Sequence, residues 1–294
     1  MFIATLIAAD RLSEGDFSAA EDRLAEAGCS PNGHGWIDEG VAGDIAFMMA
    51  PDEARLALEG AFPGVDVVVQ HAAGRRKALI VADMDSTMIT VECLDELADY
   101  AGIKPQIAAV TERAMRGELD FAEALDARVA LLEGLSESAI DQCLAERVRL
   151  MPGARALVQT MRGWGAETVL ISGGFTRFAG PVAEQIGFER VVANELLIAD
   201  GKLTGRVAKP IVDAATKEAT LIATAQSLRL NEEATLAVGD GANDLGMIRK
   251  AGLGVAYHAK PIVAAAAGAR IDHGNLSALL YAQGVPRSAW ASED

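Results

Sequence analysis

Two aspartates, Asp83 and Asp85, are separated by one residue at the end of a short apolar run. On an extended backbone this spacing directs both carboxylates to the same side, so one can attack a substrate while the other exchanges a proton. Aspartate is also common at helix N-termini, where its carboxylate accepts hydrogen bonds from free backbone N–H groups. The pair by itself therefore fits either a catalytic couple or a capped loop.

Two later apolar runs also end in polar clusters. Ser-Gly-Gly occupies 172–174, and Gly-Asp-Gly-Ala-Asn-Asp occupies 239–244. A hydroxyl and backbone N–H groups at a helix start can bind phosphate, although each cluster alone is also an ordinary turn sequence. In open α/β sheets ligands bind at the carboxyl ends of the strands, so we expect these clusters to share one crevice with Asp83 and Asp85. Carboxylates crowded in this way need a cation, and oxygen-only ligands favour Mg²⁺.

The runs that carry these clusters predict a parallel sheet. From residue 78 onward, strand-length apolar runs alternate with helical patterns, which is typical of parallel strands covered by helices on both faces. The expected fold class is therefore α/β with a doubly wound core. Asp200-Gly201 between two apolar runs predicts a β-hairpin over 194–207. The expected core strands are 78–82, 168–171, 191–192, 235–238 and 254–256.

Two segments stand apart from this core. Residues 91–148 show helical patterns without a strand-like run, and this insert is too long for a loop, so it predicts a helical cap. Residues before about 70 show short strands and two amphipathic helices, which indicates a small α+β unit. A small, basic linker follows, and we place the domain boundary there, giving domains of 1–72 and 73–294.

Composition limits the classes of partner. The chain has 294 residues, 51% of them hydrophobic, and a formal net charge of −16. Such acidity disfavours nucleic acid and anionic membranes, and a phosphate-bearing substrate would need local cations in its site. The three cysteines are widely spaced, which indicates neither a disulfide framework nor a zinc site, and no apolar run reaches spanning length. We expect a soluble, cytoplasmic protein with a small-molecule substrate.

In their order along the chain, these motifs resemble those of the haloacid dehalogenase-type phosphohydrolases over about residues 77–283. The matching segments begin at Asp83, Ser172 and Gly239, and Lys217 meets the lysine motif better than Lys209 does. The resemblance implies a Rossmann-like core with a helical cap inserted after the first strand. By element order alone, the N-terminal unit resembles ACT-type amino-acid-binding domains. Binding of an effector and assembly of a homodimer both stay open for that unit.

The resemblance also implies roles for the residues at the strand ends. Asp83 would be the nucleophile that forms an aspartyl-phosphate, and Asp85 would protonate the leaving oxygen and later activate water. Ser172 and Lys217 would hold the non-reacting phosphoryl oxygens. Mg²⁺ would be bound by Asp83, the backbone carbonyl of Asp85, and Asp240. The remaining residues implied are Asn243 beside the substrate and Asp244, which would orient the metal ligands or a bound water.

Within this family the cap pattern resembles that of the enzymes that hydrolyse O-phosphoserine, the last step of serine biosynthesis. Such a substrate carries an ammonium and a carboxylate besides its phosphate, and Glu92 and Arg128 match the positions that would recognise them. Met115 and Phe121 would shield the phosphoryl group from water, and Gly173 would donate a backbone N–H. From the residues alone, the charged pair also fits a solvated helix face, and the two apolar residues fit core positions.

Other functions stay open at the level of sequence. The same chemistry could act on another small phosphomonoester, or transfer the phosphoryl group to a different acceptor. A third class is a non-catalytic amino-acid sensor built on a degenerate core. The intact Asp83, Asp85, Lys217 and Asp240 argue against the sensor.

Overall fold

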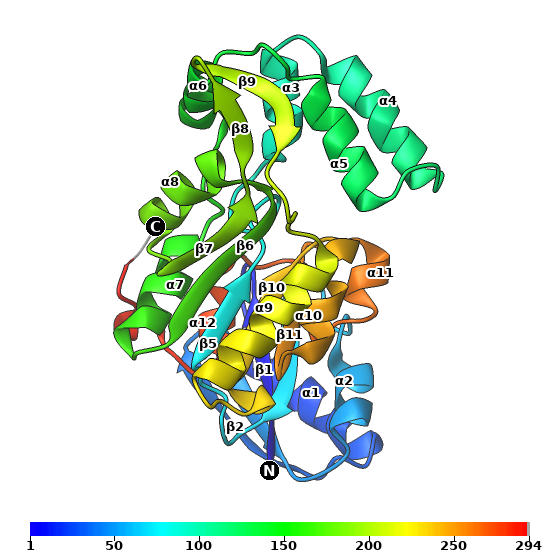
Figure 1. Ribbon diagram of the computed structural model, residues 1–294. Helices are drawn as coiled ribbons and strands as arrows, with labels where there is room; N and C mark the ends of the chain where they lie inside the picture. Colours follow the sequence, from blue (N-terminus) through cyan, green and yellow to red (C-terminus); the bar gives the residue numbers. More distant parts are fainter. Residues whose placement is uncertain (293–294) are drawn as a thin grey trace.

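The computed structural model describes residues 1–292, which contain three β-sheets (Figure 1). The largest is a six-stranded parallel sheet in the order β12-β11-β10-β5-β6-β7. Strands β5, β10 and β11 are buried along their whole length, as expected for strands covered on both faces. The strands are β5 (Leu79–Ala82), β6 (Glu167–Phe175), β7 (Arg190–Asn194), β10 (Thr235–Gly239), β11 (Leu253–Tyr257) and β12 (Ala269–Ile271).

Helices cover both faces of this sheet, which confirms the predicted α/β class. Alternate residues of β5 point to opposite faces, so Ile80 packs with one set of helices while Leu79 and Val81 pack with the other. The first set is α7 (Ala154–Gly163), α8 (Thr176–Ile186) and α12 (Ala278–Ala282). The second is α9 (Ala214–Ser227) and α10 (Leu245–Lys250), with α11 (Pro261–Ala264) packed beside α10 and β11. Short 3₁₀ turns are η1 (Glu232–Ala234), η2 (Ala242–Asp244) and η3 (Arg287–Ala289).

A cap built from two separate parts of the chain stands over one end of the parallel sheet (Figure 1). Its first part lies between β5 and β6 and consists of α3 (Cys93–Tyr100), α4 (Lys104–Met115), α5 (Phe121–Ala130) and α6 (Ser138–Arg147). Its second part is an antiparallel hairpin of β8 (Leu196–Ala199) and β9 (Lys202–Val207), which lies against α5. The hairpin turns at Asp200 and Gly201, which have φ angles of 50° and 72°. The predicted hairpin thus belongs to the cap.

The N-terminal unit is an antiparallel sheet in the order β2-β3-β1-β4 with two helices packed against it. Its separate core includes Phe17, Leu24 and Leu58. The outer strand β2 lies where the sequence favours a loop, and all eight of its residues are partly or fully exposed. The elements are β1 (Phe2–Ala8), α1 (Glu14–Glu26), β2 (Pro31–Asp38), β3 (Ala42–Phe47), α2 (Pro51–Leu58) and β4 (Val65–His71).

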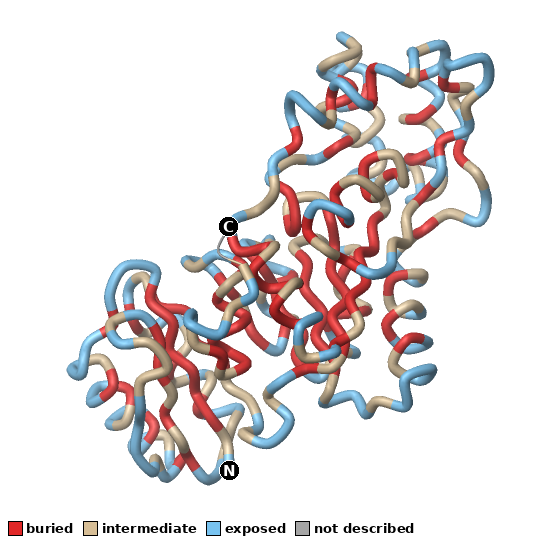
Figure 2. Tube along the Cα trace, turned by 90° about the vertical axis from the view of Figure 1, so that its left-hand side faces the viewer, coloured by how far each residue is buried: buried red, intermediate tan, exposed pale blue. Residues whose placement is uncertain are grey.

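Polar contacts fix the N-terminal sheet against the parallel sheet. The buried Asp66 carboxylate in β4 accepts hydrogen bonds from three successive backbone N–H groups after β12, including that of Asp272 at 2.8 Å and that of Gly274 at 2.7 Å. Arg75 pairs with Asp44 at 2.6 Å and also donates to two carbonyls at the end of α12. Buried backbone gathers in the two sheets, whereas the cap is more exposed (Figure 2). Within residues 1–292, no helix is long and apolar enough to cross a membrane.

Candidate active site

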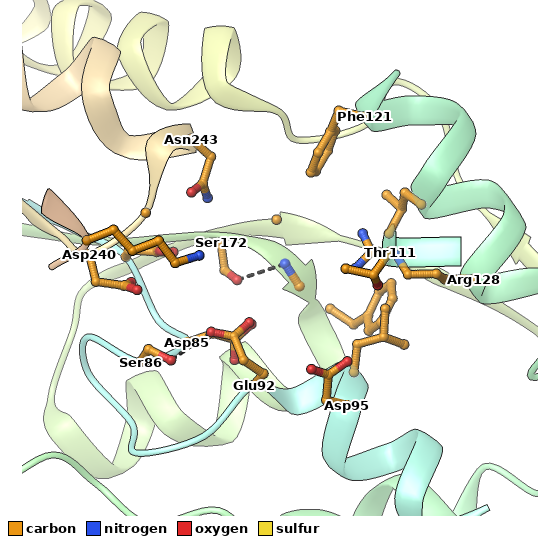
Figure 3. A pocket seen from close by; sticks show the side chains of 18 residues that line it. Asp85, Ser86, Glu92, Asp95, Thr111, Phe121, Arg128, Ser172, Asp240 and Asn243 are labelled. Carbon is orange, nitrogen blue, oxygen red and sulfur yellow. Dashed lines mark hydrogen bonds between the residues drawn. The ribbon is translucent and has the colours of Figure 1, made fainter. Parts of the chain in front are cut away.

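A cavity of about 600 Å³ lies between the carboxyl ends of the central strands and the cap (Figure 3). The core lines it with residues after β5 and β10 and with the last residues of β6, and the cap lines it with residues of α3, α4 and α5. The three polar clusters of the sequence therefore meet at one crevice, as their positions at strand ends predict. Lining residues include Asp83, Asp85, Glu92, Phe121, Arg128, Ser172, Gly173, Asp240 and Asn243.

Lys217 joins two carboxylates at the buried end of the site. Its Nζ lies 2.6 Å from Asp83 Oδ1 and 2.7 Å from Asp244 Oδ1, and its side chain is fully buried. The residue lies in the first turn of α9, which begins after Asp213, whose carboxylate accepts the backbone N–H of Thr216 at 2.8 Å. Burial alone would lower the pKa of Lys217, but the two carboxylates raise it above its ordinary value. The ammonium therefore stays charged.

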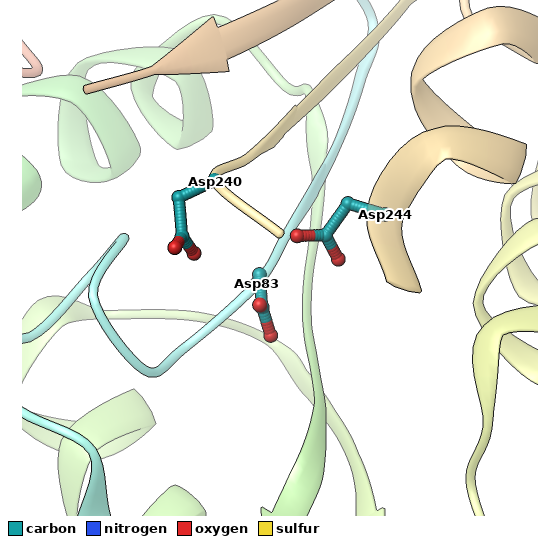
Figure 4. Close-up of side chains that lie close together, drawn as sticks. All are labelled: Asp83, Asp240 and Asp244. Carbon is teal, nitrogen blue, oxygen red and sulfur yellow. The ribbon is translucent and has the colours of Figure 1, made fainter. Parts of the chain in front are cut away.

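Asp83, Asp240 and Asp244 form a carboxylate cluster (Figure 4), with one oxygen from each within 4.8 Å of the others. Burial, together with Asp83 and Glu92, raises the pKa of Asp240 to about 6. Burial and Asp83 likewise raise the pKa of Asp244. One ammonium cannot balance three carboxylates, and all the donors are oxygens. The cluster therefore fits a hard divalent cation.

Asp85 lines the cavity and contacts the start of the cap helix α3. Its Oδ1 accepts the backbone N–H of Cys93 at 3.2 Å, which holds the carboxylate at the start of α3. Burial raises the pKa of Asp85 to about 8, and the charges of Glu92 and Asp83 add to this effect. A carboxyl group with such a pKa carries its proton at neutral pH, as a general acid must.

The segment after Ile171 leaves the regular ladder of β6. The register of β6 against β7 shifts between Ile171 and Phe175, so residues 172–174 bulge into the cavity. The backbone N–H of Gly174 donates to Ser172 Oγ at 2.8 Å. A Cβ on Gly173 would lie 3.3 Å from Phe121 Cζ, so this glycine lets the phenyl ring of the cap come close to the loop.

Two charged residues of the cap face the same cavity. Glu92 precedes α3, and its Oε1 accepts from Ser86 Oγ at 2.7 Å. Arg128 in α5 is half-buried, and its Nε donates to the carbonyl of Ala124 at 3.2 Å. Burial lowers the pKa of the Arg128 guanidinium, although Asp95 and Glu92 act in the opposite direction. The cap thus presents an anion and a cation away from the carboxylate cluster.

Three predicted site residues do not line the cavity: Lys217 and Asp244 are fully buried behind Asp83, and Met115 lies away from the site. Met115 ends α4, and its side chain is 84% exposed, because residues 115–118 form the exposed tip between α4 and α5. Phe121 at the start of α5 is 39% exposed and does line the cavity. Of the two residues expected to shield a substrate, only Phe121 is among the lining residues that the structure describes.

Some lining residues were missed by the sequence analysis. Asp95 and Thr111 line the cap side, and Lys260 lines the core side. Asp95 stands one helical turn after Glu92, and Lys260 follows the predicted strand 254–256, so spacing and the strand-end rule could have found both. Thr111 carries no comparable signal, because it is one of many polar residues on α4.

A doubly wound core whose first strand ends in a carboxylate cluster, beneath a cap inserted after that strand, defines a class of hydrolases. The family model described as haloacid dehalogenase-like hydrolase matches residues 80–249, and the chain belongs to this family.

Among relatives, the chain is 45% identical over 246 residues to a phosphoserine phosphatase of Streptomyces coelicolor, covering 83% of this chain and 60% of that protein. It is 47% identical over 207 residues to a phosphoserine phosphatase of a Polaromonas species, covering 69% of this chain and 88% of the relative. The chain thus spans less than two thirds of the length of the Streptomyces protein.

Two solved structures are similar over long stretches. The unliganded structure of a probable phosphoserine phosphatase from Vibrio cholerae superposes with a TM-score of 0.78 at 33% identity, covering 98% of this chain and 88% of that one. The structure of a phospho-aspartyl intermediate analogue of phosphoserine phosphatase has a TM-score of 0.64 at 36% identity, covering 70% of this chain and 98% of the other. The first similarity extends over both the N-terminal unit and the capped core.

Proposed function

We propose that this protein is a Mg²⁺-dependent phosphoserine phosphatase, which hydrolyses O-phosphoserine to serine and phosphate through a phosphorylated Asp83. The observation that carries the proposal is the way Asp83 is held. Lys217 Nζ and the backbone N–H of Met84 both contact Oδ1, at 2.6 and 2.8 Å. Oδ2 makes no hydrogen bond to any residue in 1–292, so an oxygen of a fixed carboxylate is left to attack phosphorus.

The remaining core residues account for charge and protons. Attack by Asp83 forms an oxygen–phosphorus bond while the bond to the serine oxygen breaks, and Asp85 gives its proton to that oxygen. Lys217 and Ser172 would hold the non-reacting phosphoryl oxygens. In the second step Asp85, now ionised, takes a proton from water, which attacks phosphorus and releases Asp83. The relative solved as a phospho-aspartyl intermediate analogue supports this route.

Magnesium is part of the proposal. Asp83, Asp240 and the backbone carbonyl of Asp85 would hold it, and Asp244, fixed by Lys217 and by the N–H of Gly241 at 3.0 Å, would orient these ligands. When bound, Mg²⁺ would neutralise the carboxylate cluster and the charge of the phosphoryl group.

The cap supplies the proposed selectivity. Glu92 would bind the ammonium of phosphoserine and Arg128 its carboxylate. Phe121 would cover the phosphoryl group, and the backbone N–H of Gly173 would bind the substrate. Asn243, which lines the cavity after η2, would contact the substrate from the core side. Met115 would join this set only if the tip between α4 and α5 moves inward.

The division of the chain belongs to the same proposal. We place an ACT-like domain at 1–72 and the phosphatase domain at 73–294, with the helical cap at 91–148. The N-terminal unit would bind an effector or assemble a homodimer, and its exposed outer strand β2 is suited to pairing with a second copy. Cys29, Cys93 and Cys143 are all free and buried, in keeping with a cytoplasmic protein.

Phosphate release from a panel of phosphomonoesters, with and without Mg²⁺, tests the function. We expect phosphoserine to be hydrolysed with the highest kcat/KM, and chelation of the metal to abolish turnover reversibly. Higher kcat/KM for another ester would reject the substrate, and full activity in a chelator would reject the metal. Adding an acceptor alcohol separates hydrolysis from phosphoryl transfer, because a transferase would form a new ester in place of free phosphate.

A further inference from the structure

Asn194 is a buried polar residue that the proposed chemistry does not use. It ends β7 and is 2% exposed. Its Nδ2 donates to the carbonyl of Gly173 at 2.8 Å and to the carbonyl of Val212 at 3.3 Å, while its Oδ1 accepts the N–H of Val212 at 2.7 Å. The residue thus connects the loop after β6 with the segment before α9.

The two contacts with Val212 fix the orientation of the Asn194 amide. One amide end accepts from the Val212 N–H and the other donates to the Val212 carbonyl, so turning the amide over would set like groups against each other. The second N–H of Nδ2 is then aimed at Gly173. A residue with a donor and an acceptor on one rigid plane is required here, and Asn provides both.

The carbonyl of Gly173 lies where β6 has left the ladder with β7. The Asn194 side chain gives it a hydrogen bond at this irregular point. Because a peptide unit is planar, holding the Gly173 carbonyl also sets the direction of the Gly174 N–H. That N–H donates to Ser172 Oγ at 2.8 Å. The Asn194 amide is thus connected to the Ser172 hydroxyl through the peptide between Gly173 and Gly174.

The Ser172 hydroxyl can both accept and donate a hydrogen bond. Its oxygen already accepts from Gly174, and its hydrogen has no acceptor among the residues that the structure describes. Ser172 is 1% exposed and lines the cavity. The hydroxyl hydrogen is therefore available to an oxygen of a bound phosphoryl group.

We propose that Asn194 is a positioning residue that acts through the peptide between Gly173 and Gly174 to hold Ser172 Oγ as a donor to the phosphoryl group. The inference rests on the proposed role of Ser172 in binding phosphate. Asn194 touches neither the substrate nor the carboxylate cluster, and its effect on catalysis passes through Ser172.

A double-mutant cycle with Ser172 tests this relation. Asn194→Leu keeps the branching and the number of side-chain heavy atoms but removes every polar contact. We expect kcat/KM to fall about 30-fold in this variant and about 100-fold in Ser172→Ala, as for loss of a donor to a phosphoryl group. If Asn194 acts through Ser172, the double variant falls less than about threefold below Ser172→Ala. Multiplied losses in the double variant would overturn the proposal.

Thr168→Val is the matched control. Thr168 is fully buried near the start of β6, the strand that carries Ser172. Its Oγ1 accepts the N–H of Glu189 at 3.0 Å, so it also connects β6 to the chain entering β7. This variant should lose stability but keep kcat/KM within about twofold. A loss as large as that of Asn194→Leu would mean that general loosening of the sheet explains both, and would overturn the proposal.

Two further arms keep the test decisive. If Asn194→Leu does not fold, Asn194→Ser enters the same cycle with the same expected non-additivity. Mg²⁺ should still raise the Tm of the Asn194 variant, because the carboxylate cluster is untouched, and loss of that rise would contradict a role confined to Ser172. The cycle is measured on the phosphomonoester that the unaltered protein hydrolyses best. A wrong substrate assignment would therefore appear in the substrate panel and leave the cycle interpretable.

Discussion

The two walls of the cavity differ in how firmly they hold their functional groups. On the core wall, Asp83 and Ser172 are buried, and behind Asp83 the fully buried Lys217 pairs with both Asp83 and Asp244. On the cap wall, Phe121 is 39% exposed, and within residues 1–292 Arg128 makes one hydrogen bond, to the carbonyl of Ala124 one turn back in its own helix. A fixed wall suits phosphoryl chemistry, since preorganised charges need no rearrangement during reaction. A looser wall suits admission and discrimination of substrates.

Replacing the proposed nucleophile, Asp83, should have the largest effect. Asp83→Asn keeps the shape of the side chain but removes the attacking carboxylate, so kcat should fall by at least about 10³-fold, as for loss of a covalent nucleophile. Phosphate release over hours, with a burst measurement, gives the value. Asp126→Asn is the control, because Asp126 forms an exposed pair with Lys209 on the cap and should change kcat less than twofold. Substantial turnover by Asp83→Asn would show that Asp83 is not the nucleophile.

Removing a cap cation should have a smaller and selective effect. Arg128→Ala should lower kcat/KM for phosphoserine about 10²-fold, because the substrate carboxylate loses a charged partner. 4-Nitrophenyl phosphate, which has no carboxylate, should lose less than about threefold. Arg116→Ala at the exposed cap tip, where Arg116 pairs with Glu112 and Glu118, is the matched control and should leave both substrates unaffected. Equal losses for the two substrates would assign Arg128 to the phosphoryl chemistry of the core wall.

The raised pKa of Asp85 predicts how kcat/KM depends on pH. Burial raises this pKa to about 8. In its proposed role as general acid Asp85 must be protonated, so kcat/KM for phosphoserine should be lost above about pH 8. The slope should approach tenfold per pH unit. Mg²⁺ near Asp83 favours the ionised form, which moves the decline to lower pH but keeps its direction.

Esters with different leaving groups test whether Asp85 donates its proton to the leaving oxygen. Glycerol phosphate has an alcohol leaving group and no ammonium, so its alkaline decline should persist. 4-Nitrophenyl phosphate releases a stable phenolate, so its decline should be absent. An equal decline for both esters would show that the titrating group is not the general acid.

Much of the core wall could be predicted from sequence because residues such as Asp83, Ser172 and Asp240 lie at the ends of buried strands. Runs such as 235–238 are apolar enough to be identified, and polar residues after them must lie at one edge of a parallel sheet. The outer strands were harder to find. The strand β2 begins Pro-Asn-Gly-His-Gly, a sequence that favours a loop, and only pairing with β3 makes it extended. The strand β12 has three residues, too few for a pattern.

Individual side-chain contacts between distant segments were not predictable. Asn194 appears in the sequence as a polar residue after a short apolar run, and nothing local indicates that its amide reaches Gly173 and Val212. The exposure of Met115 could not be predicted for a related reason. An apolar residue near the end of a helical pattern suggests burial, but whether the tip of a hairpin reaches the core depends on how the whole cap packs.

The smallest expected effect concerns this tip. In the arrangement seen here Met115 is 84% exposed, whereas Phe121 approaches Gly173. Met115→Ala should therefore change kcat/KM for phosphoserine less than about threefold, and Phe121→Ala should lower it about tenfold through loss of apolar cover over the phosphoryl group. The exposed Leu56 of α2, 84% exposed and remote from the cavity, offers Leu56→Ala as a control for loss of surface apolar area. Equal losses in the Met115 and Phe121 variants would mean that the tip folds over the substrate during turnover. The cap wall would then resemble the core wall once substrate is bound, and the difference between the walls would describe the free enzyme alone.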